Sequence, residues 1–377
     1  MRKNIKIAVS AALICVCFLG CVKQKPDISF DVRETTAAGI TNSGETTVPS
    51  TQHVTRELSE NLFIDAEAVI PEKNEYSTYT LKMVDCDPLF NLFCPEGYGS
   101  YTKEDRGNCI VYDESTGKRL VVYEKYQNEI RYTTYNFKTE ERPMQDVETL
   151  MYYHSLVYPH TEPHDLSFMN VEEMKAYGND VLIQLGISWE PMLLRCVTLS
   201  GQELLDFQEE LFGNGNNELF MTPTALTETT DTCYLQFNFA FDGIPLIGFE
   251  EPNVSSYEEF FPMEVTATIM FNADGIQSCT VSCPCTIEAT SDPQQILNLE
   301  GAITLLKDKY DLQILYEPLK FTDIWMEYIP VKRDEAWVLT PYWCLRQINE
   351  ESKGSLSYFG SAQRFNAITG KDLTYGG

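Results

Sequence analysis

Residues 265–287 read VTATIMFNADGIQSCTVSCPCTI, and this stretch decides the fold class. Its first part alternates apolar and polar side chains with the period of a β-strand, and the apolar positions are Val265, Ala267, Ile269 and Phe271. Asp274-Gly275 is a two-residue turn of the kind that joins antiparallel strands, and residues 276–287 continue as a second strand. The stretch therefore predicts an antiparallel hairpin.

The flanking residues extend this hairpin into a sheet that is covered by a helix. Residues 235–241 alternate in the same way and end at Asp242-Gly243. Asp292, Pro293 and Gln295 predict a helix start, followed by an apolar stripe of Ile296, Leu299, Ile303, Leu306 and Tyr310. Further strands are predicted at residues 312–316, 324–331, 336–345 and 359–368. This order indicates an α+β fold of antiparallel sheets with helices packed on one face.

The first half of the chain has the same mixture of elements. Strands are predicted at residues 62–70, 76–83 and 132–137, and a hairpin at 108–112 and 120–123. Helices are predicted at residues 147–158 and behind two capping boxes, Asn170 with Glu173 and Ser200 with Glu203. Asn-Gly-Asn-Asn at 214–217 indicates a boundary, so we expect two lobes: an N-terminal α+β lobe at residues 58–215 and a C-terminal α+β lobe at residues 216–377.

Residues 1–20 have the pattern of a lipoprotein signal peptide. Three basic residues precede an uncharged run over 7–20, which as a helix spans only about 21 Å of a hydrocarbon core of roughly 30 Å. The run ends in Phe18-Leu19-Gly20-Cys21. This resembles the lipobox of signal-peptidase-II substrates, from which Phe18 and Leu19 depart, and it implies lipidation of Cys21. The alternatives are cleavage by signal peptidase I and a retained anchor helix.

Residues 21–57 are predicted to be a disordered tether that begins at the lipidated Cys21. The segment is rich in Ser and Thr and has few large apolar side chains, so it cannot bury enough surface to offset the entropy of ordering. As a flexible coil it reaches roughly 30–36 Å. We expect the lipid on Cys21 to hold the protein at the extracytoplasmic face of the cell membrane. The formal charge of −28 excludes nucleic acid as a partner.

The chain has twelve cysteines, and nine remain once the three nearest the N-terminus are set aside: Cys15, Cys17 and Cys21. An odd number leaves at least one thiol free or intermolecular, which an anaerobic habitat would explain. The densest group is Cys279, Cys283 and Cys285. In a regular strand its outer members lie roughly 20 Å apart. Buried core cysteines are therefore the favoured interpretation, with disulfides to other strands or a metal site as alternatives.

The histidines give no stronger evidence for a metal. His160 and His164 would share one face of a helix, but Pro159 and Pro163 disfavour a helix there. We therefore predict no metal site, and the weak candidates are His160, His164, Cys279, Cys283 and Cys285.

No catalytic motif can be assigned from the sequence. A Gly-x-Ser-x-Gly elbow, a His-Glu-x-x-His helix and a Gly-rich nucleotide loop are all missing from the chain. The catalytic residues therefore stay unknown, and no cofactor is expected. Two groups of aromatic side chains could line a sugar groove, although core packing is favoured for Trp337 and Trp343; the groups are Tyr152, Tyr153 and Tyr158, and Trp325, Trp337 and Trp343.

Three short stretches carry resemblances to known families. Residues 241–246, FDGIPL, resemble the Gly-Ile-Pro strand and turn of PepSY-like modules. Residues 339–343, LTPYW, with 365–370, FNAITG, resemble the closing strands of extracytoplasmic regulators of a cell-wall sensor kinase. The whole layout resembles an uncharacterised Gram-positive lipoprotein family, domain of unknown function 6034. The resemblance implies an α+β scaffold that binds or regulates, and it carries no catalytic residue.

Three functions remain open from the sequence. We expect a membrane-tethered binding or regulatory module for an envelope protein or polymer. The alternatives are an envelope hydrolase that acts on glycan or peptide, and a metal- or redox-responsive lipoprotein.

Overall fold

The computed structural model describes residues 50–84, 92–93, 101–103, 109–112, 119–123, 129–134, 143–212, 230–247, 265–311, 313–333, 336–347 and 362–373. The α+β class with antiparallel sheets is confirmed. The helices of the described ranges are α3 (Pro143–Val157), α4 (Val171–Gln184), α5 (Gly201–Phe212) and α6 (Leu299–Tyr310). None of them is long and apolar enough to cross a membrane. Residues 1–49, with Cys21, lie outside the described ranges.

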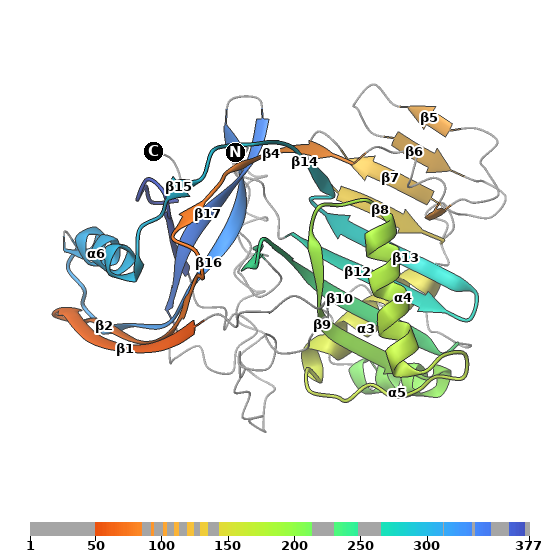
Figure 1. The fold of residues 1–377 in the computed structure, drawn as a ribbon. Helices are drawn as coiled ribbons and strands as arrows, with labels where there is room; N and C mark the ends of the chain where they lie inside the picture. The colour runs from red at the N-terminus through yellow and green to blue at the C-terminus, as the bar shows by residue number, and fades with distance from the viewer. Residues whose placement is uncertain are drawn as a thin grey trace, which may run out of the picture.

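The larger sheet has nine strands in the order β11-β10-β12-β13-β8-β7-β6-β5, and β9 also pairs with β10 (Figure 1). Neighbouring strands are antiparallel throughout. The predicted hairpins are confirmed, since β6 pairs with β7 and β12 with β13. The strands of the nine-stranded sheet are β5 (Tyr101–Lys103), β6 (Cys109–Tyr112), β7 (Arg119–Tyr123), β8 (Glu129–Thr133), β9 (Glu190–Leu199), β10 (Thr232–Phe241), β11 (Ile244–Pro245), β12 (Thr266–Asn272) and β13 (Gly275–Ser282).

The smaller sheet has seven strands in the order β1-β2-β16-β17-β4-β14, and β18 also pairs with β17. One pair is parallel, β2 with β16, and the others are antiparallel. Helix α6 contacts β2 and β18 of this sheet (Figure 1). The strands of the seven-stranded sheet are β1 (Ser50–Ser59), β2 (Leu62–Ile70), β4 (Tyr79–Met83), β14 (Cys285–Thr290), β16 (Leu319–Arg333), β17 (Ala336–Gln347) and β18 (Ala362–Asn366).

The predicted division of the chain into residues 58–215 and 216–377 is wrong. The strands on either side of residue 215, β9 and β10, are hydrogen-bonded neighbours in the nine-stranded sheet. The seven-stranded sheet instead combines residues 50–83 with residues 285–366. The nine-stranded sheet is therefore an insertion between β4 and β14. A run of turn-forming residues marks a local chain reversal, and it cannot reveal which distant strands pair.

The two sheets share one hydrophobic core and are joined by a seam of aromatic rings. The ring of Phe241, from the nine-stranded sheet, lies 4.8 Å from that of Tyr79 and 6.1 Å from that of Tyr328. The ring of Trp189 lies 5.8 Å from that of Phe241. A bridge between Leu246 and Tyr328 adds a backbone connection. The two sheets are therefore not independent bodies with separate cores.

Helices cover both faces of the nine-stranded sheet, which goes beyond the single covered face expected from the sequence. Strand β10 shows why, since Leu235 packs in the same core as α4, and Tyr234 packs with α3 and α5. Gly178 of α4 lets the helix approach closely, because a Cβ at this position would lie 2.2 Å from Leu235 Cδ1. The strand expected to be half-buried is consequently buried along most of its length.

Sequence patterns at helix starts gave correct predictions for some helices and a wrong one for another. Asn170 and Glu173 form the predicted capping box of α4, with both reciprocal hydrogen bonds present. The helix start predicted at Asp292–Gln295 is wrong, because Gln294–Gln295 form β15, which pairs with β3 (Glu75–Tyr76). Helix α6 begins later, at Leu299, where the Asn298 side chain accepts a hydrogen bond from the Gly301 N–H.

Two other expectations are also corrected. The tether was predicted to extend to residue 57, but β1 begins at Ser50 and pairs with β2. Strand β1 is a sheet edge that buries little besides Val54, so its polar composition resembles that of a linker. The strand predicted at residues 312–316 is not formed in its described part, where Ile314 is 78% and Tyr316 89% exposed.

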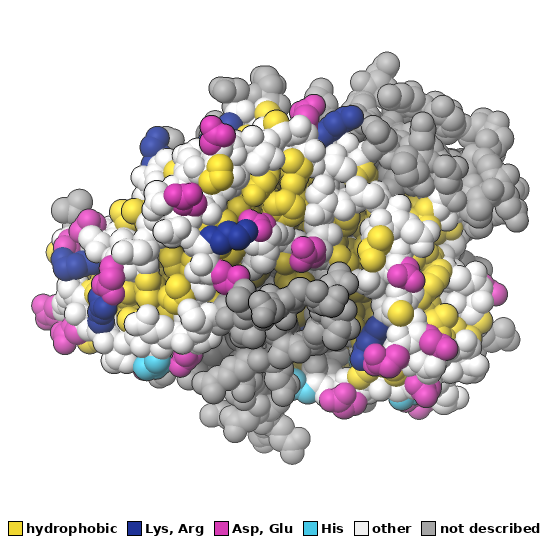
Figure 2. All heavy atoms as spheres, in the orientation of Figure 1, with side chains coloured by type: hydrophobic (Ala, Val, Ile, Leu, Met, Phe, Trp, Pro, Cys, Tyr) yellow, Lys and Arg dark blue, Asp and Glu magenta, His cyan; other side chains and the backbone are white. Residues whose placement is uncertain are grey.

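The surface carries charges of both signs. Figure 2 shows acidic side chains spread over both sheets, with Lys and Arg side chains scattered among them. Several described basic groups are engaged in ion pairs, as between Lys73 and Asp242 at 2.5 Å and between Lys320 and Asp65 at 2.7 Å. The viewed face therefore presents no basic patch of the kind that binds a polyanion.

Candidate functional site

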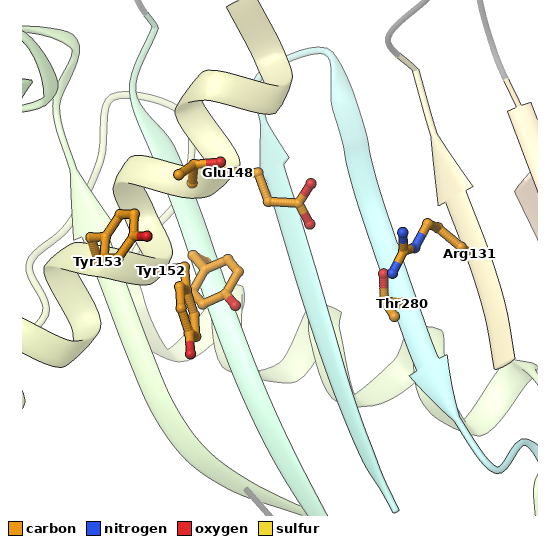
Figure 3. Close-up of a pocket in the computed structure, with 7 residues that line it drawn as sticks. Arg131, Glu148, Tyr152, Tyr153 and Thr280 are labelled. Carbon is orange, nitrogen blue, oxygen red and sulfur yellow. The ribbon is translucent and has the colours of Figure 1, made fainter. Parts of the chain in front are cut away.

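A cavity of about 280 Å³ lies between α3 and one face of the nine-stranded sheet (Figure 3). One helix and three strands supply its lining, so side chains converge on it from both sides. The lining residues are Arg131, Glu148, Thr149, Tyr152, Tyr153, Tyr234 and Thr280.

Register and helical spacing explain why these residues meet. Thr280 of β13 and Arg131 of β8 are direct partners across the antiparallel ladder, so their side chains lie on the same face of the sheet. Glu148 and Tyr152 are four residues apart on α3 and therefore share one side of the helix. Tyr234 reaches the cavity from β10, on the sheet face that α3 covers.

Packing fixes α3, and a hydrogen bond fixes its carboxylate. The apolar side of α3 carries Val147, Leu150 and Met151, which form a buried cluster with residues of α5 and β10. The hydroxyl of Ser278 donates to Glu148 Oε1 at 3.0 Å. The acid is thus held against the sheet at the edge of the cavity, where it can accept further hydrogen bonds.

The phenol of Tyr234 is held in its neutral form. The residue is only 3% exposed, and this burial, with the nearby Glu148 carboxylate, raises its pKa far above the usual range. Burial also raises the pKa of Tyr153. Both hydroxyls therefore stay protonated at neutral pH and can donate as well as accept hydrogen bonds.

Arg131 brings a cation to the opposite side of the cavity. Its Nε lies 3.0 Å from Glu129 Oε1, and the Arg131 side chain is 46% exposed whereas that of Glu129 is 7% exposed. Burial raises the pKa of Glu129, and the charge of Arg131 partly opposes that rise. A guanidinium has five N–H donors, so the pair with Glu129 leaves donors of Arg131 for other partners.

Aromatic surface lies beside these polar groups. Tyr152 is 41% exposed, and its ring centroid lies 5.8 Å from that of Tyr153. Tyr158, grouped with these two from the sequence, donates its hydroxyl hydrogen to Glu210 at 2.5 Å instead and does not line the cavity. Trp343 is buried and donates its indole N–H to the Leu297 carbonyl, which confirms core packing.

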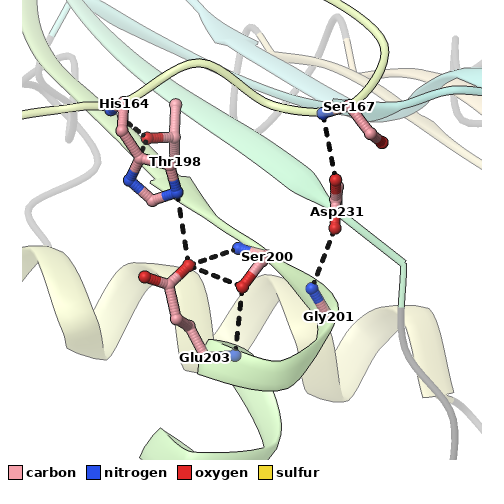
Figure 4. Close-up of polar contacts among 7 residues, drawn as sticks. All are labelled: His164, Ser167, Thr198, Ser200, Gly201, Glu203 and Asp231. Carbon is pink, nitrogen blue, oxygen red and sulfur yellow. Dashed lines mark hydrogen bonds and ion pairs between the residues drawn. The ribbon is translucent and has the colours of Figure 1, made fainter.

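A second polar group surrounds the start of α5 (Figure 4). The carboxylate of Glu203 accepts hydrogen bonds from the Ser200 N–H and hydroxyl, both at 2.7 Å, and its Oε2 lies 3.3 Å from His164 Nε2. Partial burial opposes ionisation, but these contacts hold the pKa of Glu203 below its usual range. The Ser200 hydroxyl oxygen also accepts a hydrogen bond from the Glu203 N–H at 3.3 Å, and with the bond from the Ser200 N–H to the carboxylate this confirms the predicted capping box.

The weak metal candidates do not form one cluster. His160 is exposed beyond the end of α3, and His164 contacts Glu203 and Thr198. Within the described ranges, no three His, Cys, Asp or Glu side chains lie together as a metal site. The cysteines Cys279, Cys283 and Cys285 are at most 2% exposed, so the predicted core burial is confirmed.

The strand predicted to run unbroken from residue 276 to residue 287 is interrupted. Strand β13 ends at Ser282, and Cys283 adopts a φ of 53° before Pro284. This turn brings Cys283 Sγ to 3.7 Å from Cys285 Sγ, closer than neighbours on one face of a regular strand. Six cysteines of the described ranges are thiols and form no disulfide: Cys196, Cys233, Cys279, Cys283, Cys285 and Cys344.

Sequence reasoning singled out two of the lining residues, Tyr152 and Tyr153. The spacing of Glu148 and Tyr152, on the polar side of a helix with an apolar opposite side, is a signal that could have added the acid. Arg131, Tyr234 and Thr280 could not be found in this way, because only the pairing of β8, β13, β12 and β10 brings them together.

Comparison with known proteins identifies the fold and gives no name to the site. No family model matches the chain, and no curated protein matches it. The chain is similar to the crystal structure of an uncharacterized protein from Eubacterium rectale ATCC 33656, with a TM-score of 0.50 and 16% sequence identity. The match covers 87% of this chain and 94% of that chain. At this identity the likeness shows a shared fold alone.

Proposed function

We propose that the protein is a lipid-anchored extracytoplasmic binding module whose α3 cavity captures a sugar unit of an envelope polymer. The observation that carries this proposal is the lining itself, in which one helix and three strands combine phenol rings with an acid, a guanidinium and hydroxyls. Pockets of this kind fix a ligand by apolar contact and a few placed polar groups.

The chemistry of a saccharide matches this lining. A sugar ring has apolar C–H faces that pack on aromatic rings, and its hydroxyls both donate and accept hydrogen bonds. Tyr152 offers ring surface at the mouth, while Glu148 and Arg131 offer charge-assisted hydrogen bonds. A volume of about 280 Å³ is at the lower end of ligand pockets, which suits one sugar residue better than a chain.

The alternative of a glycan hydrolase has less support from this lining. A glycosidase needs two carboxyl groups on either side of the bond that it breaks. Glu148 is the single carboxylate among the lining residues. Its Oε1 accepts a hydrogen bond from the Ser278 hydroxyl, and a carboxylate has further lone pairs that can accept a hydrogen bond from a sugar hydroxyl.

The anchor belongs to the same proposal. The lipobox resemblance at Phe18–Cys21 supports lipidation of Cys21, and the Ser/Thr-rich residues after it support a tether between lipid and fold. The proposed membership of the lipoprotein family of domain of unknown function 6034 agrees with this location. Replacement of Cys21 by Ala should release the protein from membranes or block its processing, and normal processing with membrane retention would contradict the anchor.

Binding can be tested with the full lipoprotein in detergent. Calorimetry against solubilised envelope polysaccharide and its component sugars should detect binding, because the lining of the cavity includes exposed side chains such as Tyr152. Glu148→Gln and Tyr152→Ala should each weaken it by about 10-fold or more, the loss of one hydrogen bond to a charged group or of one ring contact. Glu172→Gln is the control, since this carboxylate is 83% exposed on α4 and away from the cavity. Saccharide binding that is equal in all four proteins would reject the site.

A further inference from the structure

Three sulfur atoms gather where the chain passes from the nine-stranded to the seven-stranded sheet. Cys283 Sγ lies 3.7 Å from Cys285 Sγ, and Cys285 Sγ lies 3.8 Å from Met83 Sδ. Cys285 and Met83 are direct partners in the pairing of β14 with β4, so the sheet register fixes that contact. Both cysteines are buried, with exposed fractions of 0% and 2%.

Several hydrogen bonds hold the turn that brings the thiols together. The Cys283 carbonyl accepts from the Cys285 N–H and from the indole N–H of Trp189, both at 2.8 Å. The Pro284 carbonyl accepts from the Val84 N–H at 2.9 Å. Cys283 has a Cβ and yet adopts the left-handed region, which is strained and persists only where the surroundings enforce it. The sulfurs are therefore pre-positioned by the fold.

We propose that Cys283, Cys285 and Met83 form a binding site for a soft monovalent metal ion, copper(I). Thiolate and thioether ligands select copper(I) over harder ions. With a metal–sulfur bond of about 2.3 Å, sulfurs around one three-coordinate ion lie roughly 4.0 Å apart. The 3.7 Å between Cys283 and Cys285 and the 3.8 Å between Cys285 and Met83 are close to this value. On binding, the two thiols release their protons and the two thiolates with Met83 bind one Cu⁺, with no change of oxidation state.

This ligand set differs from the zinc-like cluster considered from the sequence. Within the described ranges no third His, Cys, Asp or Glu side chain joins the two thiols. This argues against zinc, which takes four ligands from thiolates, imidazoles and carboxylates. Cys279 does not join the group, because it lies on β13 opposite Tyr132. Met83 of β4, the strand that pairs with β14, takes its place. A copper(I) site made of three sulfurs needs neither a histidine nor a fourth ligand. The site is separate from the α3 cavity and does not depend on the function proposed there.

The site can be tested with the full protein, purified and loaded with copper(I) under anaerobic conditions. Titration against a coloured copper(I) chelator should show one ion held per chain, with sulfur neighbours in the X-ray absorption spectrum. Cys283→Ala and Cys285→Ala should lower the affinity by about 100-fold or more, above the roughly 10–100-fold of an outer-shell change. Cys279→Ala is the matched control, since it removes an equally buried thiol outside the group.

Met83→Leu keeps the proposal testable if the cysteine variants fail to fold. The exchange conserves volume, so circular dichroism should show a native fold, while the affinity should fall by about 10-fold and one sulfur neighbour should be lost. Three results would overturn the site: no copper(I) retained by the natural protein, an equal loss in Cys279→Ala, or a Cys283–Cys285 disulfide in protein purified without oxidant. Preference for zinc over copper(I) would overturn the choice of ion.

Discussion

The nine-stranded and seven-stranded sheets are built on the same antiparallel principle but are completed differently. The nine-stranded sheet is covered by helices on both faces, and α3 packs over β9 and β10 while Arg131 and Thr280 project from β8 and β13 beyond it. This offset leaves a cavity. The seven-stranded sheet is covered by α6 and encloses a buried ion pair, Arg364 Nε with Glu327 Oε1 at 2.7 Å. One sheet therefore leaves a cavity beside its covering helix, and the other encloses a buried charged pair.

The largest effect expected from this difference is in the seven-stranded sheet. Glu327→Ala should lower the free energy of unfolding by about 3–5 kcal/mol, because it removes the carboxylate from a charged pair in which the Arg364 side chain is only 6% exposed. Urea unfolding of the full protein would measure the loss. Glu288→Ala, an exposed carboxylate of β14, serves as control. A loss under about 1 kcal/mol is the value of a surface ion pair, and it would contradict a stabilising role for the pair of Glu327 with Arg364.

A somewhat smaller effect is expected in the core between α4 and the nine-stranded sheet. Leu235 is fully buried against Gly178, so Leu235→Ala should leave a cavity and lower the free energy of unfolding by about 2–5 kcal/mol. The comparison variant is Ile183→Ala on α4, whose side chain is 60% exposed and should matter little. Equal losses in thermal or urea unfolding would show that this face is less tightly packed than described.

Loss of the capping side chain should lower stability by a smaller amount, and the loss should differ between helix α5 of the nine-stranded region and helix α6 of the seven-stranded region. Ser200→Ala at α5 and Asn298→Ala at α6 each remove a capping side chain, at about 1 kcal/mol. The Ser200 variant should lose more, since its hydroxyl also donates to Glu203. Differential scanning calorimetry of both variants would rank them. The reverse order would place the stronger cap in the seven-stranded region.

The smallest effect is a pH dependence at the same cap. The pKa of Glu203 is held below its usual range, so its contacts stabilise the fold above the unfolded-state pKa of about 4.3. That contribution is lost as the pH falls through the lower folded-state pKa. Glu203→Gln should therefore be less stable than the natural protein at pH 7, and the difference should shrink in acid. A difference that stays constant from neutral to acid pH would exclude the ionised carboxylate as its cause.

Local patterns were enough to predict most individual elements. Alternation identified β10 and β12, and polar residues three apart identified the capping boxes of α4 and α5, because these signals depend on neighbours along the chain. The placement of β1, the pairing of β9 with β10 and the parallel pairing of β2 with β16 depend on contacts between distant residues. Period-two alternation cannot report such partners, which is why the predicted boundary at residue 215 was wrong.

The candidate sites show the same limit. Tyr152 and Tyr153 were noticed as neighbouring aromatics, but Arg131 and Thr280 meet them only through strand register. The cysteine group is visible in the sequence as a motif. The turn that brings Cys283 and Cys285 together is not, because a residue with a Cβ rarely adopts the φ of 53° seen at Cys283. Met83 is distant in sequence and carried no signal at all.

The insertion of the nine-stranded sheet also has a consequence for the order of folding. Strand β2 obtains its partner β16, and β4 its partners β14 and β17, only after the whole intervening segment has been made. Such long loop closures slow folding and leave strand edges open to aggregation meanwhile. The nine-stranded region has its partners nearer along the chain and should form first. We therefore expect refolding in two kinetic phases, with the aromatic seam around Phe241 closing in the slower one.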